Sequence, residues 1–246
     1  GRGGGGGGGG GNSWAYESAP LGVTNVTVLT QTNGFQTLAN KGVYQEGYVI
    51  ESIKNNEGEV LYQHEQNPVQ VFSEATASIM NDMMRSVIDE QKTSNFKSVV
   101  SGLDWNLGNA DWVGKTGSTN NWSDSWLVVS TPSITISSWS GRDDNKATDS
   151  SAGTRTAQYM AYLINRIYQS DQKVFGVDKK FELSDDVKKV KVSKATGTLP
   201  GGTVTVDNTR RTNPSDTVTS YWTKGGPKEA SFEFGIGGSN ANYADY

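Results

Sequence analysis

The spacing of apolar residues predicts three helices in the first 175 residues of the chain. Residues 24–40 carry apolar groups at helical intervals, although the pair Asn33-Gly34 within them favours a turn. Ser73 is a suitable N-cap for a second helix. The expected buried faces of the second and third helices are Ile79, Met80, Met83, Met84, Val87 and Ile88, and Ala157, Met160, Ala161, Ile164 and Tyr168. We therefore expect the methionines of the second helix to belong to a core.

Runs of β-forming residues predict strands between and after these helices. Residues 43–53 and 58–63 lie on either side of a short polar stretch, which is typical of a β-hairpin. Three more strands are expected at residues 111–117, 125–130 and 134–139. The turn between the last two is short, so they would be antiparallel neighbours. The pattern indicates an α+β fold in which helices flank an antiparallel sheet.

The character of the chain changes after about residue 175, where charged and Gly/Pro/Thr-rich segments begin. Short β patterns follow at residues 190–192, 203–206 and 232–234. We therefore expect a small all-β module over residues 176–246. Residues 1–12 are almost entirely glycine and cannot bury apolar surface, which predicts a flexible linker or an artefactual segment. Residues 13–175 would form the main folded part.

Composition excludes several classes of function. The formal net charge of -4 provides no broad positive surface, so we expect no nucleic-acid partner. The absence of cysteine excludes disulfides, thiolate catalysis and cysteine-based zinc sites. No run of about 18 apolar residues is present, so we expect no direct membrane contact from this chain. Small molecules or peptides fit better as ligands, and we expect neither a metal nor another cofactor.

The segment Lys115-Thr116-Gly117 carries the clearest candidate chemistry. It ends a predicted strand and is followed by Ser118, which gathers a lysine, two hydroxyls and a glycine at one strand end. The lysine and the hydroxyls suit a substrate carboxylate, and glycine permits a close backbone approach. The Ser118 N–H could donate to a carbonyl oxygen as it becomes an oxyanion. Because side chains alternate along a strand, a twist or bulge would be needed to bring Lys115 and the hydroxyls to one ligand.

Lys-Thr-Gly is one of three motifs of serine acyltransferases of the penicillin-binding and β-lactamase type, with Ser-x-x-Lys and Ser-x-Asn. Five segments resemble successive landmarks of class A, bifunctional penicillin-binding proteins, and the resemblance is nearest to streptococcal members. They are APLGVT (19–24), TNGFQTLANKGVY (32–44), ADWVGKTGST (110–119), WSGRDDN (139–145) and SYW (220–222). The resemblance covers about residues 15–246. It implies that residues 13–175 are the C-terminal part of a transpeptidase domain.

The resemblance also implies a function and roles for particular residues. The intact protein would be a peptidoglycan D,D-transpeptidase, which cross-links the cell wall by acyl transfer from D-Ala-D-Ala stem peptides and is a target of β-lactams. Lys115 would tune the electrostatics of the second-motif serine, and the Ser118 amide would supply half of the oxyanion hole. Thr116 and Ser118 would bind the terminal carboxylate. Apart from the resemblance, we expect Gly117 to let a ligand approach the backbone and, among the tryptophans around the predicted sheet, Trp139 to lie near the substrate site.

The first two motifs do not occur in usable positions. The chance matches are Ser94-Asn95-Phe96-Lys97, Ser170-Asp171-Gln172-Lys173 and Ser118-Thr119-Asn120, whereas the family places both motifs well upstream of Lys-Thr-Gly. We therefore expect an upstream fragment of the same protein to carry the nucleophile, and this chain alone to be inactive. The resemblance also implies an upstream glycosyltransferase domain. An upstream transmembrane helix would anchor the enzyme at the extracellular face of the bacterial cell membrane.

Other interpretations of these residues stay open. Gly114-Lys115-Thr116 could end a nucleotide-binding loop, but that motif requires glycine at position 109, which is asparagine. His64, the only histidine, lies in a polar segment typical of an exposed loop, and the aspartates of residues 143–149 lack the glycine and final glutamate of a calcium loop. The alternatives to a transpeptidase are a non-catalytic cell-wall-binding protein and a D,D-carboxypeptidase or β-lactamase on the same fold.

Overall fold

The computed structural model describes residues 19–22, 24–90, 95–201, 203–206, 209–212, 216–224, 226 and 233–234. The chain forms two compact units, and the division falls between Glu182 and Leu183. The glycine-rich residues 1–12 lie outside the described residues. Within the described ranges, none of the helices combines the length and the apolar character needed to cross a membrane.

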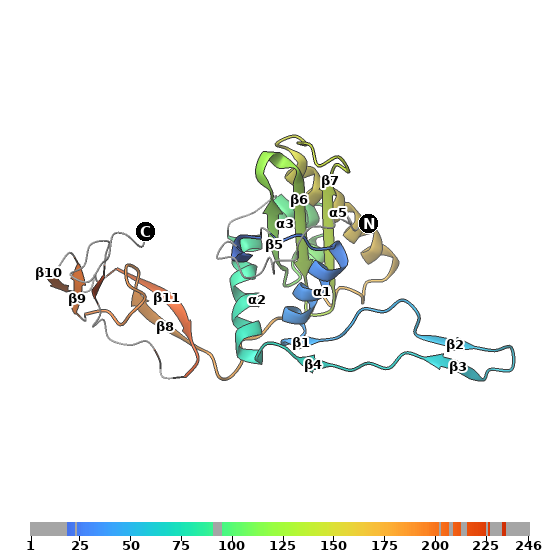
Figure 1. Cartoon of the computed structure of the whole chain (residues 1–246), viewed down its shortest axis with the longest axis horizontal. Coiled ribbons are helices and arrows are strands. Elements are labelled where there is room, and N and C mark those ends of the chain that lie inside the picture. The colour runs from blue at the N-terminus through green and yellow to red at the C-terminus, as the bar shows by residue number, and fades with distance from the viewer. Residues whose placement is uncertain are drawn as a thin grey trace, which may run out of the picture. The chain divides into compact units, whose positions relative to one another are not determined.

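A three-stranded antiparallel sheet is the centre of the first unit (Figure 1). Its strands, in spatial order, are β5 (Val113–Ser118), β6 (Asp124–Ser130) and β7 (Thr135–Gly141). Val113 pairs with Ser130 at one end of β5, and Ser118 pairs with Ser125 at the other. These strands confirm the sheet predicted from the β-forming runs. With the helices around it, the sheet also confirms the α+β fold.

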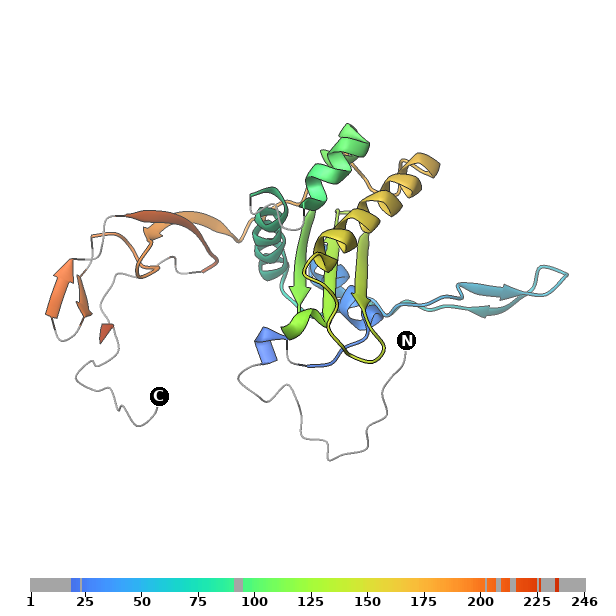
Figure 2. The ribbon, with the colours of Figure 1, turned by 90° about the horizontal axis from the view of Figure 1, so that it is seen from above.

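Helices lie on both faces of this sheet (Figure 2). Helices α3 (Phe96–Leu103) and α5 (Ala152–Ser170) cover one face, and α1 (Val28–Ala39) lies on the other. Helix α2 (Glu74–Asp89) packs against strand β5. The described ranges also contain the short helical segments η2 (Ala19–Leu21), α4 (Trp105–Gly108) and η4 (Asn120–Trp122). The spacing of apolar residues predicted α1, α2 and α5 but not α3 or α4.

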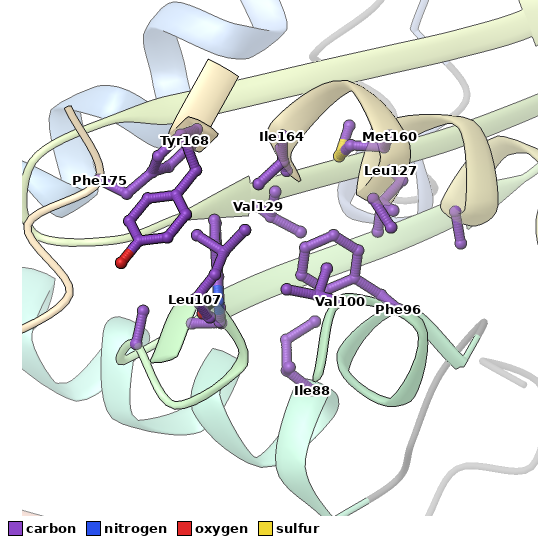
Figure 3. Close-up of a cluster of buried hydrophobic side chains, with 14 residues drawn as sticks. Ile88, Phe96, Val100, Leu107, Leu127, Val129, Met160, Ile164, Tyr168 and Phe175 are labelled. Carbon is purple, nitrogen blue, oxygen red and sulfur yellow. Dashed lines mark hydrogen bonds between the residues drawn. The ribbon is translucent and has the colours of Figure 1, made fainter. Parts of the chain in front are cut away.

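The hydrophobic core lies between the sheet and helices α3 and α5 (Figure 3). It comprises Ile88, Phe96, Val100, Leu107, Ala110, Trp112, Leu127, Val129, Ala157, Met160, Ala161, Ile164, Tyr168 and Phe175. The predicted inner face of α5 is thus confirmed. The Trp112 ring packs edge-on against Phe96, with ring centroids 5.3 Å apart, and its N–H donates to the Leu107 carbonyl at 2.9 Å. Because Trp112 directly precedes β5, the core fixes where this strand begins.

Hydroxyl side chains define where α1 and α2 begin. Thr27 accepts a hydrogen bond from the Thr30 N–H, and Ser73 accepts one from the Thr76 N–H, each at 3.1 Å. The second bond confirms the predicted cap, because the oxygen satisfies a donor that has no partner within the helix. Asn33-Gly34 lies inside α1. The helical spacing of apolar residues therefore outweighs the local turn preference of this pair.

Helix α2 buries only part of the face that was predicted, namely Met84 and Ile88. Met84 is buried, but Met80 and Met83 are 37% and 50% exposed, so the prediction that these two belong to the core is wrong. The buried side instead includes Asn81, whose side-chain amide donates to the Leu38 carbonyl of α1 at 3.0 Å. The small residues Ala75, Ala77 and Ser78 are buried together with Asn81, whose bond ties this side of α2 to α1.

The segment between α1 and α2 forms a long hairpin that extends away from the sheet in both views (Figures 1 and 2). Strand β1 (Val43–Tyr44) pairs with β4 (Val69–Gln70), and β2 (Ser52–Lys54) pairs with β3 (Val60–Gln63). The Asn55 side chain organises the tip by accepting from the N–H groups of Glu57 and Glu59 at 3.0 and 2.9 Å. The predicted hairpin is confirmed, although residues 43–53 form two strands instead of one.

The described part of the second unit consists of short strands and turns. Strand β8 (Lys188–Ser193) pairs antiparallel with β11 (Thr217–Trp222), and β9 (Thr203–Val206) lies between β10 (Thr209–Thr212) and β12 (Glu233–Phe234). The Lys189 ammonium lies 5.4 Å from the centre of the Tyr221 ring, which is a cation–π contact across β8 and β11. Of these strands, β10 and β11 have no counterpart in the sequence prediction.

Candidate active site

The Lys115–Ser118 segment lies where strand β5 leaves the core. The first two residues of β5 are buried, whereas Thr116 and Gly117 are half-buried and Lys115 and Ser118 are exposed. Among the described strands, β5 pairs only with β6. Its outer edge therefore carries backbone groups that an extended ligand can use.

Side chains of the segment project alternately from the two faces of the sheet. The β5–β6 register runs without a bulge from Val113 to Ser118. Lys115 and Gly117 therefore share one face, and Thr116 and Ser118 share the other. The bulge that would bring all four to one face is absent from this pairing. Lys115 and the hydroxyls can reach a common ligand only if that ligand lies along the edge of the strand.

Lys115 has no carboxylate within ion-pair distance among the described residues. Its Nζ instead donates to the carbonyl oxygen of Thr116 at 2.9 Å, which is a neutral acceptor. The positive charge of Lys115 is therefore not neutralised by a described side chain. An exposed cation next to hydroxyls can make charge-assisted hydrogen bonds to an anionic ligand.

The two glycines of strand β5 differ in what their neighbours allow. A Cβ added at Gly114 would lie 2.5 Å from the Val128 carbonyl oxygen, so packing within the sheet requires glycine there. A Cβ at Gly117 would lie 3.5 Å from the Trp126 Cβ, which is ordinary van der Waals contact. The surrounding chain therefore does not require glycine at position 117. A ligand that approaches the backbone closely would require it.

A hydrogen-bonded turn follows Ser118. The Thr119 hydroxyl donates to Asp124 Oδ2 at 2.9 Å and accepts from the Asp124 N–H at 3.0 Å. The other carboxylate oxygen, Oδ1, accepts from the Trp139 indole N–H at 2.8 Å. Trp139, on strand β7, lies opposite Trp126 of strand β6 and is 39% exposed. The sequence analysis singled out Trp139 but missed Thr119 and Asp124. The only signal for them was an acidic residue, Asp124, at the start of a strand.

The loop after β7 is folded by exposed ion pairs. Arg142 hydrogen-bonds both carboxylate oxygens of Asp144 at 2.9 Å and lowers the pKa of Asp144 to about 2. Arg155 hydrogen-bonds Asp149 in the same way, which also lowers the pKa of that carboxyl. The Thr148 N–H donates to the Trp122 carbonyl at 3.0 Å, so the loop contacts the turn between β5 and β6. These aspartates therefore serve the fold of the loop.

A partly buried ion pair supports the start of the Lys115 strand. Arg85 on α2 bonds Asp111 through Nε at 2.7 Å and through Nη2 at 2.8 Å. Asp111 Oδ2 also accepts from the Phe181 N–H at 2.7 Å. Burial by itself raises the pKa of Asp111, but the hydrogen bonds from Arg85 and Phe181 and the charges of Arg85 and Lys180 hold it below its usual value of 3.8. The pair ties α2 to the residues that precede β5.

The remaining candidates from the sequence lie elsewhere. The Ser170 hydroxyl is exposed at the end of α5 and donates to the Arg166 carbonyl at 3.1 Å. Ser94 lies outside the described residues. His64 is half-buried and stacks on Tyr48 at 3.8 Å, in contrast to the exposed loop histidine that was predicted. Within the described ranges, no group of three or more His, Asp or Glu side chains could hold a metal ion.

Comparison with known families identifies a similar domain. A family profile described as "Penicillin binding protein transpeptidase domain" matches residues 6–128, which is half of the chain and includes Lys115–Ser118. The match ends within strand β6. Strand β7, with Trp139, and the second unit lie beyond it.

Two curated relatives extend the similarity. Penicillin-binding protein 1A of Rickettsia conorii is 28% identical over 202 residues, which is 76% of this chain and 25% of the relative. Penicillin-binding protein 1A of Aquifex aeolicus is 30% identical over 162 residues, or 63% of this chain and 21% of the relative. The chain thus spans about a quarter of the length of these relatives.

The fold also resembles the solved structure of another penicillin-binding protein 1A. The crystal structure of penicillin-binding protein 1A from Haemophilus influenzae matches with a TM-score of 0.62 and 18% sequence identity. The match covers 89% of this chain and 35% of that protein. At this level of identity the likeness concerns the fold alone.

Proposed function

The chain belongs to the penicillin-binding protein transpeptidase family, and on this premise we propose that it forms one wall of a peptidoglycan D,D-transpeptidase active site. The observation that carries the proposal is Lys115, an exposed cation where an edge strand leaves the core, without a described carboxylate partner. Two hydroxyls, of Thr116 and Ser118, lie in the same segment. This combination suits the terminal carboxylate of a D-Ala-D-Ala stem peptide or of a β-lactam.

The reaction follows from these groups and a serine outside the chain. That serine attacks the penultimate D-Ala carbonyl, the terminal D-Ala leaves, and the acyl group passes to an amine of a neighbouring strand. The Ser118 N–H donates to the oxyanion formed during attack. Because Lys115 and the hydroxyls lie on opposite faces of β5, we propose that the stem peptide lies along the edge of this strand that no described strand covers, where both can reach its carboxylate. β-Lactams acylate the same serine.

The nucleophile is proposed to lie in an upstream fragment that carries Ser-x-x-Lys and Ser-x-Asn. We expect fluorescent penicillin to label the intact protein there, because an activated serine needs a neighbouring lysine. Proteolysis followed by mass spectrometry locates the labelled peptide. Label on Ser118, Ser170 or another serine of this chain would contradict the assignment. Replacing Ser170 with alanine is the matched control and should leave labelling unchanged.

Replacing Thr116 with valine tests the carboxylate site. The change keeps a β-branched side chain in β5 but removes a hydroxyl that would bond the carboxylate, so acylation by penicillin should slow by about 10- to 100-fold. Stopped-flow measurement on the intact enzyme gives the rate constant. Thr219→Val, at an exposed position of β11, makes the same chemical change away from the site and should have no effect. Equal rates in the two variants would remove Thr116 from the site.

Several broader proposals rest on the sequence resemblance. We propose an upstream glycosyltransferase domain, an upstream membrane anchor, an extracellular position and a relationship nearest to streptococcal members. Residues 13–175 would be the C-terminal part of the transpeptidase domain and residues 176–246 a separate β module. A non-catalytic cell-wall-binding protein is the main alternative, and the absence of Ser-x-x-Lys from the preceding sequence would favour it. Release of free D-Ala without cross-linking would favour a carboxypeptidase.

A further inference from the structure

The Asp124 carboxylate connects the turn that follows β5 to strand β7, at the end of the candidate site. One oxygen accepts a hydrogen bond from the hydroxyl of Thr119, the residue that follows Ser118, at 2.9 Å. The other accepts from the Trp139 indole N–H at 2.8 Å, on strand β7. Asp124 itself begins β6, between these two strands. A single side chain therefore fixes both the turn after Ser118 and the orientation of the indole.

The position of the Trp139 ring is also set by packing. A Cβ added at Gly141 would lie 2.4 Å from Cζ2 of Trp139, so the ring occupies space that any larger residue at position 141 would need. Trp139 shares a face of the sheet with Gly117, because both are aligned with Trp126 across the three strands. The ring is 39% exposed although its N–H is bonded. A partly exposed ring in a fixed orientation is suited to pack against a ligand.

We propose that Asp124 is a positioning residue of the acyl-transfer site and that Trp139, which it orients, is a specificity-determining wall. The inference rests on the proposed transpeptidase function. Through Thr119, the carboxylate sets the position of the neighbouring Ser118 N–H, which governs the rate of acylation. Through Trp139, which lies across β6 on the face of the sheet that Gly117 shares, it sets an apolar surface for any part of the donor peptide or of a β-lactam side chain that extends from the edge of β5 over β6, which governs binding.

Stopped-flow acylation of the intact enzyme by a fluorescent penicillin separates these two effects. We expect Asp124→Ala to lower the limiting rate constant about tenfold and to raise the half-saturating concentration about threefold. Asp124→Asn should stay within about twofold of the wild type, because its amide oxygen can accept from Trp139 and its NH2 group can donate to Thr119. Trp139→Phe should raise the half-saturating concentration to the same extent and leave the limiting rate constant unchanged.

A purely structural role would give a different result. If Asp124 had only a structural role, Asp124→Ala would lower the fraction of enzyme that is labelled but would leave the rate constant of the labelled fraction unchanged. That result would overturn the inference. Wild-type rates in Asp124→Ala would also overturn it. Failure of the wild-type protein to be labelled would overturn the proposed function and this inference together, whereas normal labelling of wild type and Asp124→Ala would reject the inference alone.

Fluorine NMR of the protein containing 5-fluorotryptophan provides a signature independent of activity. The Trp139 resonance is identified by its loss in Trp139→Phe. We expect it to shift in Asp124→Ala, because the indole loses its carboxylate partner, and to keep its position within the line width in Asp124→Asn. An unchanged Trp139 resonance in Asp124→Ala would show that the carboxylate does not orient the ring and would overturn the inference.

Discussion

Replacing Lys115 with alanine should slow penicillin acylation of the intact enzyme by about 100-fold, which corresponds to about 3 kcal/mol of transition-state stabilisation. The wild-type lysine is exposed, and its Nζ has only the Thr116 carbonyl as a described acceptor. Its charge is therefore available to the ligand carboxylate and to the serine that becomes acylated. Stopped-flow fluorescence measures the rate constant directly.

A matched control separates this effect from a general change of charge. Lys54 is an exposed lysine of the hairpin strand β2, so Lys54→Ala removes the same charge away from the site and should leave acylation unchanged. Lys115→Arg keeps the charge but changes its shape and hydrogen-bonding geometry, and should recover only part of the rate. A wild-type rate in Lys115→Ala would remove this residue from the active site.

The long amphipathic elements of the fold could be predicted from sequence because their patterns are sustained. Helix α5 keeps one apolar face over 19 residues, and that face is buried as expected. Helix α3 has only eight residues, and Asn95 before it has a positive φ and no capping hydrogen bond, so its start carries no sequence signal. Met80 and Met83 were placed wrongly because the periodicity does not show which side of a helix its neighbours cover.

Some residues of the candidate site could likewise be predicted from the sequence and others could not. Lys115–Ser118 could be found because the motif is contiguous and its residue types suit a carboxylate. Thr119 and Asp124 could not be assigned to the site from an acidic residue at a strand start alone, because their hydrogen bonds form only when the turn between β5 and β6 closes. The bond from Trp139 to Asp124 depends on the register between β6 and β7, which the predicted antiparallel pairing does not specify.

Breaking the pair between Arg85 and Asp111 should destabilise the first unit by about 2–4 kcal/mol. The side chain of Asp111 is 6% exposed and that of Arg85 is 26% exposed. Arg85→Met keeps an apolar stem but leaves the carboxylate largely buried without its guanidinium partner. Chemical denaturation of the intact protein, followed by tryptophan fluorescence, measures the change. Lys97→Met is the control, because Lys97 and its partner Asp89 are each 36% exposed and should contribute less than about 1 kcal/mol.

The same pair predicts a dependence on pH with a definite sign. The pKa of Asp111 lies below 3.8 in the folded protein, so its contribution to stability is present above this value and is lost as the pH falls through the lower folded pKa. The difference between the wild type and Arg85→Met should therefore shrink below about pH 3.8. A difference that is constant with pH would show that lost packing, and not lost charge pairing, causes the destabilisation.

A double variant distinguishes the attraction of the two charges from the cost of leaving one unpaired. Asp111→Leu in the Arg85→Met background removes the charge of Asp111 but keeps Asp82, the second carboxylate that pairs with Arg85. It should therefore recover part of the lost stability, because apolar replacement of both partners of a buried pair is often neutral. If the double variant is instead less stable than Arg85→Met, the Asp111 carboxylate must stabilise the unit mainly through its bond from the Phe181 N–H, at 2.7 Å. The start of β5 would then depend on the segment around Phe181 more than on α2.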